Sequence, residues 1–121
     1  MEQLTQLNRV EVRGIIGNVR LTKISDTICA KVTVATNYAY KAKDSSCIIE
    51  TTWHSANLFP GKNIREEDLE KIQKGDKVHI IGRLRAQRYT GVDGTERTVY
   101  EISASSLEIL GGNEVMQLET A

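Results

Sequence analysis

The stretch "NRVEVRGIIGNVRL", residues 8–21, decides the fold class. Val10 and Val12 alternate with charged residues, and a period of two is typical of a β-strand with one buried face. Gly14 and Gly17 then interrupt the alternation. Glycines inside a strand often mark bulges or sharp bends, and a small closed barrel needs such bends at its corners. The stretch therefore predicts one strand of a small barrel.

Four more segments with the strand pattern follow. Residues 28–36 form the second strand, residues 37–47 are a polar loop, and residues 48–59 form the third strand. Residues 76–89 and 97–110 form the fourth and fifth strands. In the fifth strand the alternation resets past Ser105 to Leu107 and Ile109, which indicates a second bulge.

Two local signals connect these strands. Asp93-Gly94 is a hairpin signal between the fourth and fifth strands. Residues 63–74 predict a short helix, with Asn63 as its N-cap and Glu66 completing a capping-box pattern. The order β-β-β-α-β-β, with the helix between strands three and four, predicts an all-β OB-fold. This fold is a five-stranded Greek-key barrel that often binds oligonucleotides.

Length and composition are those of one globular domain. The chain has 121 residues, of which 40% are apolar and 26% charged. We expect an N-terminal segment over residues 1–7, the domain over residues 8–110 and a short tail over residues 111–121. No apolar run is long enough to span a bilayer. The N-terminus has no targeting pattern, so we expect a cytoplasmic protein.

The cysteines and histidines indicate neither a metal site nor an enzyme. Cys29 and Cys47 are the only cysteines, too few for a disulfide scaffold and wrongly spaced for a zinc site. We expect two reduced thiols, no metal and no cofactor. His54 and His79 both lie within strand patterns, and the sequence contains none of the common catalytic motifs. We therefore expect a protein without catalytic activity, in which each histidine is a packed or interface residue.

The charges are unevenly distributed. The formal net charge is zero, but four acidic residues are concentrated at the start of the expected helix, which is typical of a solvated helix N-terminus. Outside that cluster the basic residues outnumber the acidic ones. Four arginines lie near the last hairpin, and they predict a basic surface there: Arg83, Arg85, Arg88 and Arg97.

Strand parity places two aromatic side chains on one face of the third strand. If Ala56 and Leu58 point into the barrel, Trp53 and Phe59 point outward. Aromatic platforms among basic groups are what binding of single-stranded nucleic acid requires, because every base can stack on them. Two alternatives stay open: these side chains form a binding surface, or they cap the barrel or lie in an oligomer interface. Tyr100 shares the parity of the apolar positions in the fifth strand, so we expect it in the core.

Four segments, taken together, resemble the single-stranded DNA-binding protein (SSB) family of bacteria and mitochondria. They are "NRVEVRGIIG" (8–17), "AKVTVATNYAY" (30–40), "TTWHSANLF" (51–59) and "IQKGDKVHIIGRLRAQRYTGVDGTERTVYEI" (72–102). The resemblance implies an OB-fold module without catalytic activity that coats single-stranded DNA in replication, recombination and repair. It also implies a homotetramer associated with the bacterial nucleoid.

The resemblance also implies roles for particular residues. Tyr38 competes with Tyr40 for one stacking position, and His54 matches a subunit contact. Arg83 is suggested by strand parity rather than by the motif. The four expected stacking residues are Tyr40, Trp53, Phe59 and Tyr89. The expected phosphate contacts are Arg9, Lys62, Arg83, Arg85, Arg88 and Arg97.

The sequence departs from the family pattern at two places. Pro60 is inserted between Phe59 and Gly61, where it affects the exit from the third strand and the direction of Phe59. The chain also ends at "NEVMQLETA", without the Gly/Pro/Gln-rich linker and acidic tip by which bacterial members recruit replication proteins. Either this member lacks such recruitment or the chain is truncated, and a mobile-element, plasmid or accessory member fits better than the main replication protein.

Two other functions remain as alternatives. One is a dimeric, primosomal-type OB protein that bridges single strands and replication proteins. The other is an OB module for protein interaction, in which the exposed aromatic side chains form a permanent interface. The motif matches favour the SSB family over both.

Overall fold

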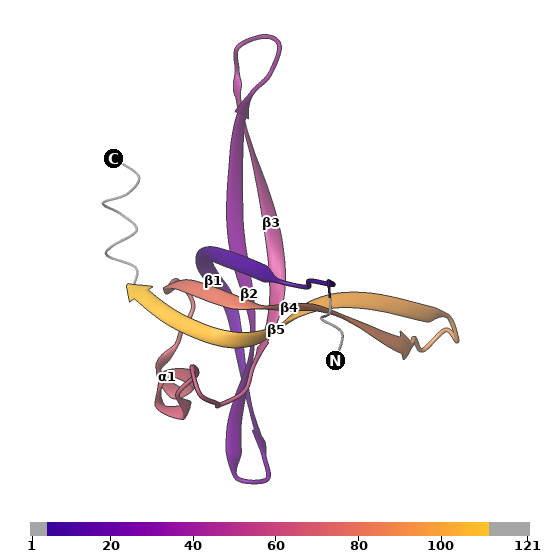
Figure 1. The fold of residues 1–121 in the computed structure, drawn as a ribbon. Coiled ribbons are helices and arrows are strands. Elements are labelled where there is room, and N and C mark those ends of the chain that lie inside the picture. Colours follow the sequence, from indigo (N-terminus) through magenta and orange to yellow (C-terminus); the bar gives the residue numbers. More distant parts are fainter. Residues whose placement is uncertain (1–4, 112–121) are drawn as a thin grey trace.

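A computed structural model describes residues 5–111 and shows a single closed barrel (Figure 1). Its strand order is β1–β2–β3–β5–β4. Neighbouring strands are antiparallel except for β3 and β5, which are parallel. The five-stranded barrel with one helix after β3 confirms the predicted OB-fold. The elements are β1 (Val10–Ile24), β2 (Thr27–Lys41), β3 (Cys47–Leu58), α1 (Glu66–Lys71), β4 (Lys77–Thr90) and β5 (Glu96–Gly111).

The expected terminal segments fall mostly outside this description. Of the segment over residues 1–7, only residues 5–7 are described. Of the tail over residues 111–121, only Gly111 is described, and it is the last residue of β5. The other tail residues lie outside the described part of the chain.

The core fills the barrel and continues beneath α1. Val32 and Val34 of β2 alternate into it, as period two predicts, and Leu69 of α1 is completely buried in the same cluster. Ile64 and Ile72, on either side of the helix, belong to the same cluster. The apolar side chains of α1 and its flanks therefore close one end of the barrel.

Both predicted strand irregularities are present. The register of β1 against β2 shifts between Ile16 and Asn18, which makes Gly17 the bulged residue. In β5, the pairs Ile81↔Ser106 and Gly82↔Ala104 leave Ser105 as an extra residue. These bulges bend the strands and allow the sheet to close.

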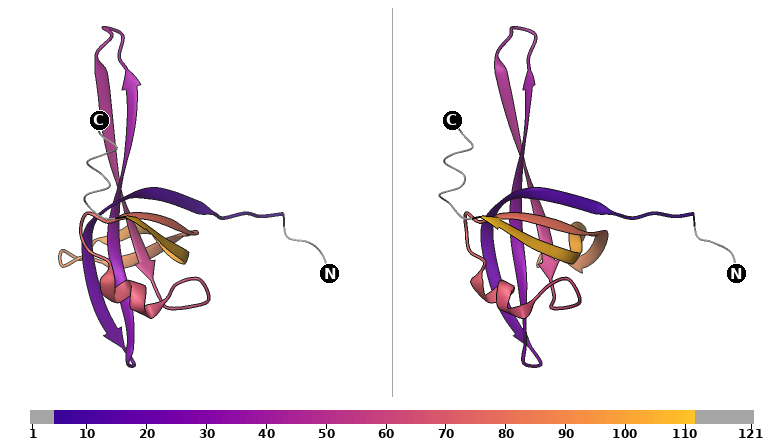
Figure 2. Two further views of the ribbon diagram at one scale, coloured as in Figure 1. Left: turned by 90° about the vertical axis from the view of Figure 1, so that its left-hand side faces the viewer. Right: turned by 60° about the vertical axis from the view of Figure 1, so that its left-hand side comes forward.

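Three hairpins project beyond the barrel (Figures 1 and 2). The β2–β3 hairpin is longer than we expected, because residues 37–41 continue β2 and only residues 42–46 form its loop. Tyr38 and Tyr40 pair with Glu50 and Ile48 there, and tyrosine and isoleucine are strong strand formers. The predicted turn at Asp93-Gly94 connects the β4–β5 hairpin.

The prediction that Tyr100 lies in the core is wrong. Its parity is that of Ile102, which is buried, but the Tyr100 side chain is 64% exposed. On this face of the β4–β5 hairpin, the pair of Ile102 and Leu84 is followed by the pair of Tyr100 and Ala86, which already lies beyond the end of the core. Parity indicates the face of a side chain, whereas the length of the barrel decides whether that face is covered.

The helix is shorter than predicted, and the expected capping box is absent. α1 begins at Glu66, its N-cap is Arg65, and no side chain caps it. The backbone carbonyl of Asn63 instead accepts a hydrogen bond from Leu107, and a β-bridge between Gly61 and Ile64 closes a turn over residues 62–63. Docking of this segment on the barrel therefore overrides its local helix signal. Among residues 5–111, no helix is long and apolar enough to cross a membrane.

Candidate nucleic-acid interface

Trp53 and Phe59 lie on the outer surface of the barrel, as strand parity predicts. Their side chains are 60% and 50% exposed, whereas Ala56 and Leu58 are completely buried. Neither aromatic ring is therefore part of this chain's core. The exposure of two large aromatic side chains on one side of a strand is typical of a binding surface.

The indole of Trp53 lies against the bulge of β1. A Cβ atom at Gly17 would overlap Cζ3 of the Trp53 ring and lie 2.8 Å from Cη2. Only glycine permits this close approach. One edge of the ring is therefore supported by backbone while most of the side chain stays exposed. The sequence indicated a bulge at Gly17, but it held no signal for the contact with Trp53.

Pro60 does not turn Phe59 away from this surface. Phe59 follows the last residue of β3 and lines a hollow together with Arg20, Lys31 and Asn57. Asn57 has the same strand parity as Trp53, and Lys31 is its partner on β2. Phe59 and Trp53 therefore lie on the same outer face, on either side of Asn57.

A row of polar side chains crosses this face from strand to strand. The cross-strand pairs are Arg20↔Lys31 and Lys31↔Asn57, and Glu101 contacts the second pair from β5. Glu101 in turn pairs with Arg85 of β4. We call these five residues the polar row. Sequence analysis identified only Arg85 among them, because the other four become neighbours through strand register alone.

Glu101 is the buried member of the polar row. Its side chain is 5% exposed and forms an ion pair of 2.6 Å with Nζ of Lys31. Nδ2 of Asn57 donates a second bond, 3.2 Å long, to Oε1 of Glu101. The hydrogen bond from Lys31 lowers the pKa of Glu101 most, and Asn57 and the charges of Lys31 and Arg85 lower it further against the effect of burial. Glu101 therefore stays ionised and holds Lys31 in place.

The β4–β5 hairpin carries several of the predicted contacts, but not all on one side. Arg83, Arg85 and Tyr89 share a parity, and Tyr89 pairs with Arg97 across the hairpin. Nη2 of Arg97 lies 3.8 Å from Oδ2 of Asp93. Arg88 has the opposite parity. The structure thus brings four of these five predicted contacts onto one side of the hairpin.

Two predicted phosphate contacts lie away from Trp53. Arg9 forms an ion pair of 3.7 Å with Glu11 and lines a hollow together with Arg83. Lys62 lines a different hollow, together with Asp68 and His79. Both therefore lie near carboxylates, outside the group formed by the two aromatic rings and the polar row.

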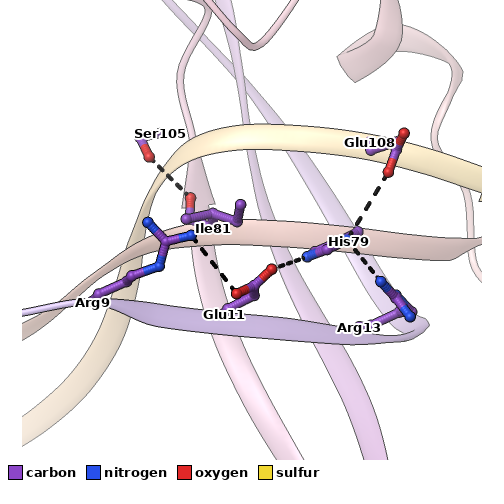
Figure 3. Close-up of polar contacts among 7 residues, drawn as sticks. All are labelled: Arg9, Glu11, Arg13, His79, Ile81, Ser105 and Glu108. Atoms are coloured by element: carbon purple, nitrogen blue, oxygen red, sulfur yellow. Dashed lines mark hydrogen bonds and ion pairs between the residues drawn. The ribbon is translucent and has the colours of Figure 1, made fainter.

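The histidine of β4, His79, lies in a separate group of charges on β1, β4 and β5 (Figure 3). Its Nε2 lies 2.6 Å from Oε2 of Glu11, and its Nδ1 lies 3.4 Å from Nη2 of Arg13 and 4.0 Å from Glu108. The hydrogen bond to His79 is the main cause of the lowered pKa of Glu11. Acidic and basic groups alternate on this face, whereas cations predominate around Trp53 and Phe59.

Tyr38 and Tyr40 lie on the other side of the β2–β3 hairpin from Trp53. Their register partners are Glu50 and Ile48, whose parity is opposite to that of Trp53. The two ring centroids are 5.9 Å apart. Tyr40 donates a 3.2 Å hydrogen bond to Glu50 and is 38% exposed, whereas Tyr38 is 67% exposed. Tyr38 is therefore the more accessible of the two candidates.

The predicted contact residue His54 also faces away from Trp53. It is half-buried, and its Nε2 lies 2.8 Å from Oγ1 of Thr36 on β2. This hydrogen bond orients the imidazole at the base of the β2–β3 hairpin. Nothing in this environment resembles a catalytic arrangement of acid, base and nucleophile.

Comparisons with known proteins agree with this geometry. The model of the "Single-strand binding protein family" matches residues 7–110. A "Single-stranded DNA-binding protein" of Neisseria meningitidis is 30% identical over 88% of this chain and 61% of its own length. One from Xylella fastidiosa is 36% identical over 88% of this chain and 65% of its own length. This chain thus spans less than two thirds of each of these two relatives.

Solved structures show the same fold. The "Plasmodium falciparum SSB complex with ssDNA" superposes with a TM-score of 0.74 at 19% identity, over 90% of this chain and 99% of that one. A deletion mutant of the single-stranded DNA binding protein from Thermus aquaticus gives a TM-score of 0.69 at 18% identity, over 88% of this chain and 51% of that one. With its barrel, its exposed aromatic face and the family match over nearly all described residues, this chain belongs to the single-strand binding protein family.

Proposed function

We propose that this chain binds single-stranded DNA with little sequence preference and without catalytic activity. The observation that carries the proposal is the placement of Trp53 and Phe59, both at least half exposed, on one outer face beside the cations of the polar row. Bases of any sequence can stack on such rings, at about 1–3 kcal/mol per base. Tyr89 extends this arrangement along β4, and Tyr40 or Tyr38 is proposed as a further stacking residue on the other side of the projecting β2–β3 hairpin.

Phosphate contacts supply the rest of the proposed binding. Arg83, Arg85 and Arg97 lie along the same side of the β4–β5 hairpin as Tyr89. Arginine and lysine follow the phosphates of a strand whose bases stack, and they make the affinity depend on salt. Arg9, Lys62 and Arg88 are proposed as peripheral contacts, because Arg9 and Lys62 lie beside carboxylates and Arg88 faces the other side of the β4–β5 hairpin.

Fluorescence titration with oligo-dT tests this function. Trp53 is the only tryptophan, so its emission reports directly on the proposed stacking site. We expect quenching on binding, micromolar or tighter affinity at low salt, and weaker binding as salt is raised. Unchanged emission together with no binding of oligo-dT at low salt would contradict the proposal.

A double substitution separates DNA binding from a protein-interaction module. Trp53→Ala with Phe59→Ala should weaken binding of oligo-dT and leave the oligomer intact. If the two rings formed a permanent interface, the same variant would dissociate. Tyr100→Ala is a matched control, because it removes a similarly exposed ring from the other side of the β4–β5 hairpin.

We propose a homotetramer in which His54 lies at a subunit contact. Its position on the side of β3 opposite to Trp53 leaves the aromatic face free in such an assembly. Measured mass in solution distinguishes a tetramer from the dimer expected of a primosomal-type relative. His54→Ala should lower the mass while Thr36→Val, which removes only its hydrogen-bond partner, should lower it less. We place this activity in replication, recombination or repair at the bacterial nucleoid, where single strands arise.

A further inference from the structure

Two cations lie directly opposite each other on the β1–β2 hairpin. Arg20 and Lys31 are register partners on the outer face. Like charges in this position repel and destabilise an antiparallel pair. Among residues 5–111, the side chain of Arg20 forms no hydrogen bond or ion pair, and that of Lys31 has one carboxylate partner, Glu101. The pair therefore keeps unused donors at a cost in stability, which fits a site for an anionic ligand.

Two hollows meet at this pair of cations. Both are lined by Arg20 and Lys31. One also contains Asn18 and Thr33, so most of its lining residues are polar. The other contains Phe59. The cations thus stand between a polar hollow and an aromatic ring on the surface that carries Trp53.

Glu101 orients Lys31 without neutralising the site. Its carboxylate is 2.6 Å from Nζ of Lys31 and is also bound by Asn57. An ammonium group has three donors, so two remain for a ligand. The carboxylate of Glu101 interacts with Lys31 and Arg85. Arg20 adds a third positive charge beside Lys31, so the polar row keeps a net positive charge.

We propose that Arg20 and Lys31 form a phosphate subsite for the backbone of the single strand whose base stacks on Phe59. The strand then continues from Phe59 onto the β1–β2 hairpin, with its phosphates between the two cations. This inference rests on the proposed function and assigns to the same ligand two residues that the family resemblance did not mark as DNA contacts. Glu101 is a positioning residue, because it acts through Lys31.

The test compares the salt dependence of binding in three variants. Arg20→Gln removes the cation that has no described partner. The double variant, Arg20→Gln with Lys31→Gln, removes both cations. Lys23→Gln is the matched control, because it also removes one positive charge, but from a side chain that has the opposite parity on the same hairpin. Binding of oligo-dT is followed by the emission of Trp53, which none of these substitutions touches.

We expect the slope of log affinity against log salt to become shallower by about 0.7 for Arg20→Gln and by about 1.4 for the double variant, since each phosphate contact to a single strand contributes about 0.7. Lys23→Gln should keep the wild-type slope. A slope for Arg20→Gln equal to that of Lys23→Gln would overturn the subsite while wild-type binding still supports the proposed function. Failure of the wild-type protein to bind oligo-dT would instead contradict the function itself.

Folding does not obscure this result. Arg20→Gln removes no described contact, so its fold should persist, and thermal unfolding verifies this. Lys31→Arg keeps the charge beside Glu101 and should retain the wild-type slope. If the salt dependence of binding became as shallow in Lys31→Arg as in Lys31→Gln, the positive charge at this position would not be what the ligand recognises.

Discussion

The indole ring of Trp53 lies on Gly17, with no room for a Cβ atom between them. The bulge that bends β1 thus also supports the single aromatic side chain of β3. Support from rigid backbone on one side is a form of preorganisation, because the ring does not have to be ordered when a base stacks on its free surface.

Gly17→Ala tests this support. The new methyl group overlaps Cζ3 of Trp53, so the ring must move. We expect a change in the Trp53 emission of the free protein and weaker binding of oligo-dT. Gly61→Ala is the control, because the nearest atom to its Cβ would be the carbonyl oxygen of Phe59 at 3.9 Å. Equal effects of the two substitutions would show that the contact with Trp53 is unimportant.

The two tyrosines of the β2–β3 hairpin should differ in their contribution to binding. Tyr38 is more exposed than Tyr40, whose hydroxyl is held by Glu50. We expect Tyr38→Ala to weaken binding of long oligo-dT more than Tyr40→Ala does, by up to about 1–3 kcal/mol for one stacked base. Tyr38→Phe keeps the ring and should bind as the wild type does. The opposite order of the two alanine variants would identify Tyr40 as the stacking residue.

Stability at acid pH should depend on Glu101. Its pKa in the folded state is lowered from 4.5, mainly by the hydrogen bond from Lys31. Its contribution is therefore complete above about pH 4.5 and is lost as the pH falls through the lower pKa of the folded state. Urea unfolding between neutral and acid pH should show a smaller loss of stability in Glu101→Gln than in the wild type. Part of the loss should remain, because the pKa of Glu11 is lowered as well.

A control carboxylate makes the pH experiment specific. Glu70→Gln removes an exposed carboxylate of α1 that forms no described ion pair. If Glu101→Gln and Glu70→Gln changed the loss of stability at acid pH equally, the ion pair between Glu101 and Lys31 would not be the cause of that loss. At neutral pH, Lys31→Gln should cost about 1–3 kcal/mol, since it leaves a buried carboxylate with fewer partners.

Asn8 should stabilise the start of the β4–β5 hairpin. Its side-chain amide donates to the carbonyl of Leu84 and accepts from the N–H of Leu84, each over 2.8 Å. Asn8 thus replaces a backbone partner at the edge of β4. Asn8→Ala should cost about 1–2 kcal/mol for two exposed hydrogen bonds, measured by urea unfolding. Asn8→Asp replaces the donor by a second carboxylate oxygen that faces the carbonyl of Leu84, so it should lose at least as much as Asn8→Ala. Wild-type stability in either variant would contradict this account.

Much of the fold follows from local patterns. Alternation of apolar and polar residues indicated the strands, and the interruptions at Gly17 and Ser105 indicated both bulges. The errors have a common origin in contacts between distant segments. Asn63 does not cap α1, because it lies in the turn between Gly61 and Ile64 and its carbonyl accepts a hydrogen bond from Leu107 of β5. Tyr100 has the correct parity for the core but lies beyond its end.

By itself, the sequence determined which strands form and which side of β3 carries Trp53 and Phe59, because strand parity is a property of adjacent residues. Only the tertiary structure decided that Gly17 supports Trp53 and that Arg20, Lys31 and Glu101 become neighbours. These contacts depend on the register of strands far apart in the chain, which closure of the barrel sets. The aromatic platform was therefore predictable from the sequence, whereas the polar row beside it was not.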